Sequence, residues 1–169
     1  KSPGPQRVQH QADAARARVL LFVRTDCPIT NRYAPELQRI ASEFARQGVQ
    51  FWLIYPDPTE TATGIRTQMA EYKLPGKALR DSHHELVARA RASVSPQAAV
   101  FDGGGRLIYT GRIDDRYVDF GKARPSARTH DLEAAIRAVL SGKPVTLSRT
   151  RAVGCYLAET DTRRGAAMA

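Results

Sequence analysis

The chain has 169 residues, of which 42% are hydrophobic and 25% charged, and its net charge is +9. This length fits one globular domain with a buried core. The longest apolar run, Val19 to Val23, is far shorter than the roughly 20 residues that a membrane-spanning helix needs. The arginines are spread along the whole chain without a nucleic-acid-binding motif, so we interpret the charge as a surface property and expect no nucleic-acid partner.

The N-terminal residues 1–16 are polar and contain Pro3 and Pro5, which predicts a flexible lead. The first residue is Lys1 rather than Met, and we expect the lead to follow a removed signal or membrane anchor. This predicts an extracytoplasmic protein, periplasmic or secreted, that works near a membrane.

Residues 17–142 are predicted to form one α/β domain that begins with two βα units. The apolar run Val19–Val23 is typical of a buried strand, and residues 49–55 form a second such run. Between them, from 31 to 47, apolar residues recur every three or four positions, which predicts a helix. A second helix is predicted up to Tyr72, and this βαβα order favours parallel strands at the centre of the sheet.

In the second half of the domain the spacing of the apolar residues changes. A helix is predicted after Ser82, followed by a hairpin of two short strands over 97–101 and 106–110. Residues 114–128 are polar and are predicted to be a functional loop. Thr129 is expected to cap a final amphipathic helix.

Two cysteines, Cys27 and Cys155, lie far apart in the sequence, which excludes a CxxC pair and a four-cysteine zinc site. Residues 143–158 contain Cys155 among apolar residues and are predicted to be a C-terminal extension that packs on the domain. Residues 159–169 are predicted to be a disordered tail.

The order of these elements, together with the sequence around Cys27, resembles the thioredoxin fold. In that fold a strand runs into an active-site cysteine at a helix start, and a proline follows eight residues later, as Pro35 does here. Ser95-Pro96, before the strand over 97–101, resembles the fold's cis-proline loop. The resemblance implies an α/β fold whose central mixed sheet combines a parallel βαβ half with an antiparallel ββ hairpin, is flanked by helices and carries the C-terminal extension.

Three segments resemble bacterial redoxin-domain proteins of the peroxiredoxin-like (AhpC/TSA-like) group. They are Asp26–Ile29, Gly111–Asp115 and Gly154–Cys155. The resemblance implies thiol chemistry at one active-site cysteine. Thr30 stands where thioredoxins carry their second cysteine, which excludes a dithiol cycle within the motif, and Arg24 stands where peroxiredoxins carry threonine.

Cys27 is expected to be reactive because of its place at a helix start. There it faces unpaired backbone N–H groups and the positive end of the helix dipole, and both favour the thiolate. We therefore predict a pKa for Cys27 below the reference value of about 8.5. Thr30, one turn along, can offer its hydroxyl to the sulfur.

The expected substrate-binding residues come from three places. Pro28 follows the cysteine directly, and a cis bond before Pro96 would bring the backbone of Ser95 beside Cys27, where it can bind an extended substrate. Asp114 and Asp115 follow the hairpin, in a loop that borders the cysteine in this fold, and are candidates for substrate contacts.

The leading functional hypothesis is a thiol-disulfide oxidoreductase or peroxiredoxin-like redoxin. Cys27 would attack a protein disulfide or a peroxide, Cys155 would resolve the intermediate, and an unidentified thiol would donate electrons. Alternatively, Cys27 and Cys155 hold Cu(I), or the chain is a non-catalytic module that docks a partner at the Ser95-Pro96 edge. Cys155 can also be no more than a packed residue. No other cofactor or metal site is expected.

Overall fold

The computed structural model describes residues 14–157, whose centre is a five-stranded mixed sheet with the order β3-β2-β1-β5-β6. Strands β1, β2 and β3 are parallel, whereas β5 and β6 are antiparallel to their neighbours. The bounds are Ala17–Phe22 for β1, Val49–Tyr55 for β2, Lys77–Arg80 for β3, Gln97–Asp102 for β5 and Leu107–Gly111 for β6. The predicted mixed sheet of a thioredoxin fold is confirmed.

Strand β1 lies in the middle of the sheet because both of its faces are apolar. Val19 and Leu21 belong to one hydrophobic cluster, and Leu20 and Phe22 belong to the cluster on the opposite face. This alternation is the period of two that a strand imposes on its side chains. All four side chains are buried, so β1 holds the residues that follow it in a fixed position.

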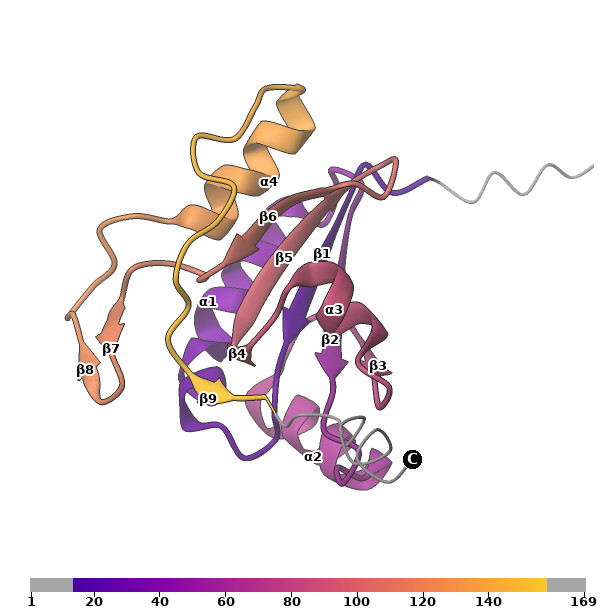
Figure 1. The fold of residues 1–169 in the computed structure, drawn as a ribbon, viewed down its shortest axis with the longest axis vertical. Helices are drawn as coiled ribbons and strands as arrows, with labels where there is room; N and C mark the ends of the chain where they lie inside the picture. The colour runs from indigo at the N-terminus through magenta and orange to yellow at the C-terminus, as the bar shows by residue number, and fades with distance from the viewer. Residues whose placement is uncertain (1–13, 158–169) are drawn as a thin grey trace, which may run out of the picture.

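Helices cover both faces of this sheet (Figure 1). Helix α1 (Pro28–Phe44), α2 (Ala62–Tyr72) and α4 (Asp131–Ser141) contribute side chains to the cluster that includes Val19. The short helix α3 (Glu85–Ala90) covers the opposite face, where Leu86 and Ala90 pack against the cluster that includes Leu20.

Two small sheets lie beside the main one (Figure 1). Strand β4 (Val94–Ser95) pairs antiparallel with β9 (Cys155–Tyr156), which belongs to the C-terminal extension. Strands β7 (Tyr117–Asp119) and β8 (Lys122–Ala123) form a hairpin inside the polar stretch that we predicted to be a loop. The polar pattern gave no strand alternation there, so the sequence offered no local evidence for this hairpin.

Several predicted boundaries were wrong. Helix α1 begins at Pro28 rather than Asn31, because a proline is well accommodated in the first turn, where its missing N–H is not needed. The residues that precede α3 and α4 are His84 and His130, in place of the predicted caps Ser82 and Thr129. Neither histidine caps its helix through its side chain.

Two residues of the predicted lead pack against the folded domain. Ala15 is buried, the Arg16 N–H donates to the carbonyl of Gly48 at 2.8 Å, and the Arg16 guanidinium reaches the carbonyl of Leu140 at 2.7 Å. The prediction of a flexible lead was therefore wrong for Ala15 and Arg16. The rest of the predicted lead, over 1–13, and the predicted disordered tail, over 159–169, lie outside the described residues.

The helices within residues 14–157 are all too short or too polar to cross a membrane.

Candidate active site

Cys27 lies at the turn between β1 and α1 and is the residue that precedes the first turn of the helix. Its side chain is completely buried. The thiol donates a hydrogen bond to the backbone carbonyl of Ser95 at 3.1 Å. This hydrogen bond therefore joins the segment around Cys27 to the segment around Ser95, which lies far along the chain.

Ser95 and Pro96 form the wall opposite Cys27. The peptide bond between them is cis, as the resemblance implied, and both residues are buried. The Ser95 hydroxyl and the Thr30 hydroxyl share a hydrogen bond of 2.9 Å. Thr30 thus ties the first turn of α1 to the Ser95 wall.

The C-terminal extension occupies the edge of β4 that we expected to bind substrate. Cys155 is the register partner of Ser95, and the N–H of Leu157 donates to the carbonyl of Ser93 at 3.1 Å. Cys155 is half-buried, and both cysteines are free thiols. An extended partner can use the edge of Ser95 only if β9 leaves it.

Two glycines allow the extension to lie so close to the domain. A methyl group on Gly154 would collide with the carbonyl oxygen of Ser95, and one on Gly111 would collide with Thr150. Thr150 is also fixed by backbone hydrogen bonding, because its N–H donates to the carbonyl of Thr110 at 3.2 Å. The extension is therefore held at β6 and at β4.

Arg24 holds β9 from the other side. Its guanidinium pairs with Asp26 through contacts of 3.0 and 2.9 Å and donates to the carbonyl of Tyr156 at 2.8 Å. Asp26, the carboxylate next to Cys27, is thus neutralised by a partner rather than left to oppose ionisation of the thiol. The sequence gave no indication that Arg24 contacts the backbone of Tyr156.

The pKa of Cys27 lies below its ordinary value. Burial alone would raise it, but hydrogen bonding from Cys155 and from the N–H and hydroxyl of Thr30 favours the thiolate and outweighs burial. The Ser95 carbonyl works in the other direction, since it can accept a hydrogen bond only from the neutral thiol. When Cys27 ionises, its sulfur therefore loses the hydrogen bond to the Ser95 carbonyl and accepts hydrogen bonds from Cys155 and Thr30.

The pKa of Cys155 is raised to about 11. Burial is the main cause, and the neighbouring Cys27 adds to it by hydrogen bonding and by charge, whereas Arg24 opposes the shift. The two thiols are thus unequal. Cys27 ionises first, and Cys155 remains the protonated partner that stabilises it.

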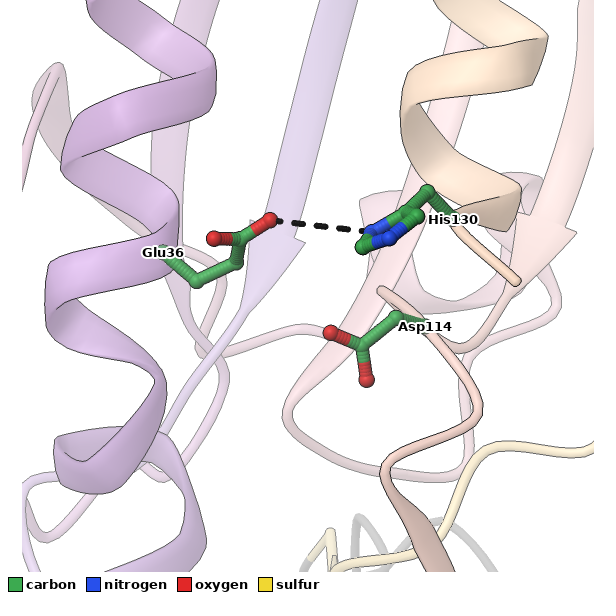
Figure 2. Close-up of side chains that lie close together, drawn as sticks. All are labelled: Glu36, Asp114 and His130. Atoms are coloured by element: carbon green, nitrogen blue, oxygen red, sulfur yellow. Dashed lines mark ion pairs between the residues drawn. The ribbon is translucent and has the colours of Figure 1, made fainter. Parts of the chain in front are cut away.

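Asp114 is buried away from solvent at the start of the loop after β6. It accepts hydrogen bonds from the Tyr33 hydroxyl at 2.6 Å and from the N–H of Arg116 at 2.9 Å. Figure 2 shows it beside Glu36 of α1 and His130 at the start of α4, and the ligand atoms of these three residues lie within 4.8 Å of one another.

This group has the residue types of a metal site, but its carboxylates already have partners. Glu36 accepts two hydrogen bonds from Arg39, at 3.0 and 2.7 Å, and lies 3.9 Å from His130. Asp114 is committed to Tyr33, whose pKa rises through burial and through this carboxylate. We assign no ion to the group.

Asp115 also has internal partners. Its carboxylate accepts from the N–H groups of Arg128 at 2.6 Å and Thr129 at 2.9 Å, and so closes the loop that contains the β7–β8 hairpin. The expected substrate contacts of Asp114 and Asp115 remain predictions, with these internal roles beside them. Pro28, the other expected substrate residue, is exposed at the first position of α1.

A family model described as "AhpC/TSA family" matches residues 5–110, more than half of the chain. The chain belongs to this family. The match includes Cys27, Thr30 and the Ser95-Pro96 segment but ends before the extension, so Cys155 lies outside it. Among curated proteins, none matches the chain.

Solved structures show the same fold. A hypothetical protein from Sinorhizobium meliloti 1021 is 26% identical with a TM-score of 0.72, over 88% of this chain and 82% of that protein. A putative thiol:disulfide interchange protein DsbE from Chlorobium tepidum is 16% identical with a TM-score of 0.57, over 75% and 82%. A secreted Mycobacterium tuberculosis disulfide oxidoreductase homologous to E. coli DsbE is 18% identical with a TM-score of 0.50, over 75% and 81%. These likenesses show the thioredoxin-like fold, and the family match identifies the chain as a redoxin.

Proposed function

We propose that this AhpC/TSA-family redoxin is a two-cysteine thiol oxidoreductase, in which Cys27 is the nucleophile and Cys155 the resolving thiol. The observation that carries the proposal is the position of the two cysteines on the two sides of Ser95. Cys27 bonds the Ser95 carbonyl, and Cys155 is the strand partner of the same residue. The pKa directions support the same roles, since Cys27 is the more acidic thiol.

In the first step the Cys27 thiolate attacks an oxidant. With a hydroperoxide, the sulfur takes one oxygen as the O–O bond breaks, and an alcohol or water leaves with a sulfenic acid on Cys27. With a disulfide, the S–S bond of the substrate breaks, one thiolate leaves, and a mixed disulfide forms on Cys27. Thr30 positions the sulfur by holding Ser95 and by donating to the thiolate.

In the second step Cys155 attacks the Cys27 sulfur. A disulfide forms between the two cysteines, and water leaves from the sulfenic acid or the second thiol leaves from the mixed disulfide. Once Cys27 is oxidised it carries no negative charge, so its contribution to the raised pKa of Cys155 disappears. The resolving thiol therefore becomes easier to ionise only after the first step.

The burial of Cys27 favours an oxidant of small cross-section. The Cys27 side chain has no exposed surface, and β9 covers the edge where an extended polypeptide would bind. A hydroperoxide or a small disulfide needs less displacement of β9 than a protein disulfide does. The non-catalytic alternative, in which Ser95-Pro96 docks a partner, requires β9 to be displaced first.

The test compares oxidants and variants. Reduced protein is mixed with hydrogen peroxide or oxidised glutathione, and the loss of free thiols is followed over time. The proposal expects both thiols to disappear together in the wild type, and it expects Cys155→Ser to stop at a sulfenic acid or a mixed disulfide on Cys27. Wild-type protein that loses only one thiol contradicts it.

The Cu(I) alternative is tested on the same variants. Two neighbouring thiols are a suitable ligand pair for this soft ion. Titration of the reduced protein with Cu(I), in competition with a chromophoric chelator, should give tight stoichiometric binding that Cys27→Ser abolishes if copper handling is the function. Weak binding alongside fast thiol oxidation supports the redox function instead.

We also propose an extracytoplasmic location and a thiol-based redox partner. A disulfide between Cys27 and Cys155 persists best in an oxidising compartment. One structural neighbour is described as a secreted disulfide oxidoreductase, and another as a thiol-disulfide oxidoreductase. Fractionation of cells that express the full-length protein, with its native N-terminus, tests the location.

A further inference from the structure

The face of the main sheet that lies away from α1 has little helical cover. Within residues 14–157, the helix that packs on this face is α3, which has only 6 residues, whereas α1, α2 and α4 contribute to the opposite face (Figure 1). The strands β2, β1 and β5 are the middle three of the sheet. Parallel strands such as β1 and β2 are normally covered on both faces, so an open stretch above them is a candidate binding surface.

Beside α3 this face contains a cavity of about 300 Å³, which we call the Trp52 cavity. Leu20, Trp52 and Phe101, one from each of the three middle strands, line it together with Leu79 of β3 and Leu86 of α3. The Trp52 side chain is partly exposed, and Leu79 is 43% exposed. The lining is therefore largely apolar and open to solvent, as in sites that take small organic ligands.

Positive charge surrounds this apolar lining. Arg18 and Arg89 line the cavity, and among residues 14–157 no acidic side chain lines it and neither arginine forms an ion pair. The Arg89 guanidinium lies 5.7 Å from the centre of the Phe101 ring, and the Lys77 ammonium lies 5.9 Å from the Trp52 ring. The cations are thus held beside the two aromatic rings without a carboxylate of the described chain to neutralise them.

Arg18 is the cation best placed to bind a ligand. It lies on β1 two residues before Leu20, so its side chain leaves the strand on the same face of the sheet. Arg18 is half-buried, which brings its guanidinium close to the apolar lining. A guanidinium in such a place binds a carboxylate through two parallel hydrogen bonds, and these are stronger where water is partly excluded.

We propose that the Trp52 cavity binds a small amphipathic anion, namely a carboxylate that carries one unbranched alkyl chain. The apolar side chains take the alkyl chain, and Arg18 takes the carboxylate, with further attraction from Arg89 and Lys77. Ligand cavities range from about 300 to 1,000 Å³, so this one is small and fits a single short chain rather than a lipid with two.

This site is separate from the thiol chemistry proposed above. Cys27 belongs to the hydrophobic cluster on the opposite face of the sheet, and neither cysteine lines the Trp52 cavity. We therefore expect the reduced and the oxidised protein to bind the ligand equally well. A failure of the redox proposal leaves this inference standing, and a failure of this inference leaves the redox proposal standing.

The first experiment uses the fluorescence of Trp52, which is the only tryptophan of the chain. The full chain is titrated with decanoate below the concentration at which decanoate forms micelles. We expect a saturable shift of the emission to shorter wavelength as the chain covers the indole ring. Acetate should cause no shift, and decanol should bind at least about tenfold more weakly because it lacks the charge-assisted hydrogen bonds. Absence of a saturable shift with decanoate overturns the site.

The second experiment places the ligand with matched variants. Arg18→Gln should weaken decanoate binding at least about tenfold and leave decanol binding unchanged, and Leu79→Ala should weaken both about threefold. Arg66→Gln on α2 and Leu147→Ala, both at exposed positions outside the cavity, are the controls and should change neither affinity. Equal decanoate affinities in Arg18→Gln and Arg66→Gln overturn the proposal.

Arg18→Lys guards against a loss of binding that comes only from misfolding. It keeps the positive charge but loses the paired hydrogen bonds, so its decanoate affinity should lie between those of the wild type and Arg18→Gln. The thermal midpoint of each variant is measured without ligand, and decanoate should raise it only in the variants that bind. A midpoint that decanoate raises equally in the wild type and Arg18→Gln contradicts the role of Arg18.

A membrane surface offers the same combination of anionic groups and alkyl chains, and vesicles distinguish it from a free ligand. Vesicles of phosphatidylcholine with phosphatidylglycerol are added to the protein in place of decanoate. We expect no shift of the Trp52 emission, because the cavity holds a single chain. A shift with these vesicles and none with free decanoate overturns the small-molecule site and indicates a membrane-binding face instead.

Discussion

A single methyl group added at Gly154 should move Cys155 away from Cys27. In the Gly154→Ala variant the new Cβ atom would collide with the Ser95 carbonyl, and the Pro96 nitrogen would lie only 3.1 Å away. Both neighbours are backbone atoms, so the collision can be relieved only by a shift of the backbone. The extension must therefore shift away from β4. The main sheet and its core do not include Gly154 and should stay intact.

The cost follows from the contacts that hold β9. The N–H of Leu157 donates to Ser93 at 3.1 Å, and Arg24 donates to the carbonyl of Tyr156 at 2.8 Å. At a net value of about 1 kcal/mol for each hydrogen bond, their loss weakens docking by about 2 kcal/mol, which is about 30-fold in an equilibrium constant. The Cys27–Cys155 disulfide should become less stable by the same factor.

The assay is the equilibrium of the protein disulfide with glutathione, measured by quenched thiol counting. Gly104→Ala is the matched control, because a Cβ atom there meets only Asp102 at an ordinary contact distance of 3.4 Å. We expect a fall of about 30-fold for Gly154→Ala and no change for the control. An equilibrium constant for Gly154→Ala within threefold of the wild type would refute the account of how β9 is held.

Three further predictions concern single groups. Thr30→Val should raise the pKa of Cys27, because it removes the hydroxyl that favours the thiolate. The pH profile of thiol oxidation should therefore move to higher pH. Thr67→Val, at an exposed position on α2, is the control and should leave the pH profile unchanged. In the reduced protein the raised pKa of Cys155 contributes stability that is fully present below about pH 8.5 and is lost as pH rises to about 11, so the urea midpoint of the wild type should fall more steeply over this range than that of Cys155→Ser. Asp115→Ala should lower the free energy of unfolding by about 2 kcal/mol, since two part-buried hydrogen bonds, from the N–H groups of Arg128 and Thr129, are lost at about 1 kcal/mol each. A raised KM for the oxidant at unchanged stability would instead indicate a substrate contact.

The main domain could be predicted from local sequence because its elements carry strong periodic patterns. The apolar run that contains Leu21 gave the central strand, and the spacing of Leu37 and Ile40 gave the long helix α1. Helix boundaries were less predictable. His84 precedes α3 in a left-handed conformation, φ 57°, which the spacing of the apolar residues does not indicate.

The candidate site was only half predictable. Cys27 and Thr30 lie in one turn, so their relation follows from sequence alone. The pairing of Cys155 with Ser95 joins segments that are far apart, and no local pattern specifies it. The dipeptide Gly154-Cys155 was the available indication, and its meaning depends on a close approach to Ser95 that only the three-dimensional structure reveals.

The central claim is that Cys27 and Cys155 form one redox pair within a single chain. The most direct measurement oxidises dilute reduced protein with one equivalent of hydrogen peroxide and maps its disulfides by non-reducing peptide mass spectrometry. The account predicts one intramolecular bond between Cys27 and Cys155 in nearly all molecules, formed at a rate independent of protein concentration. Recovery of Cys155 as a free thiol beside an oxidised Cys27, or of dimers linked between chains, would contradict it.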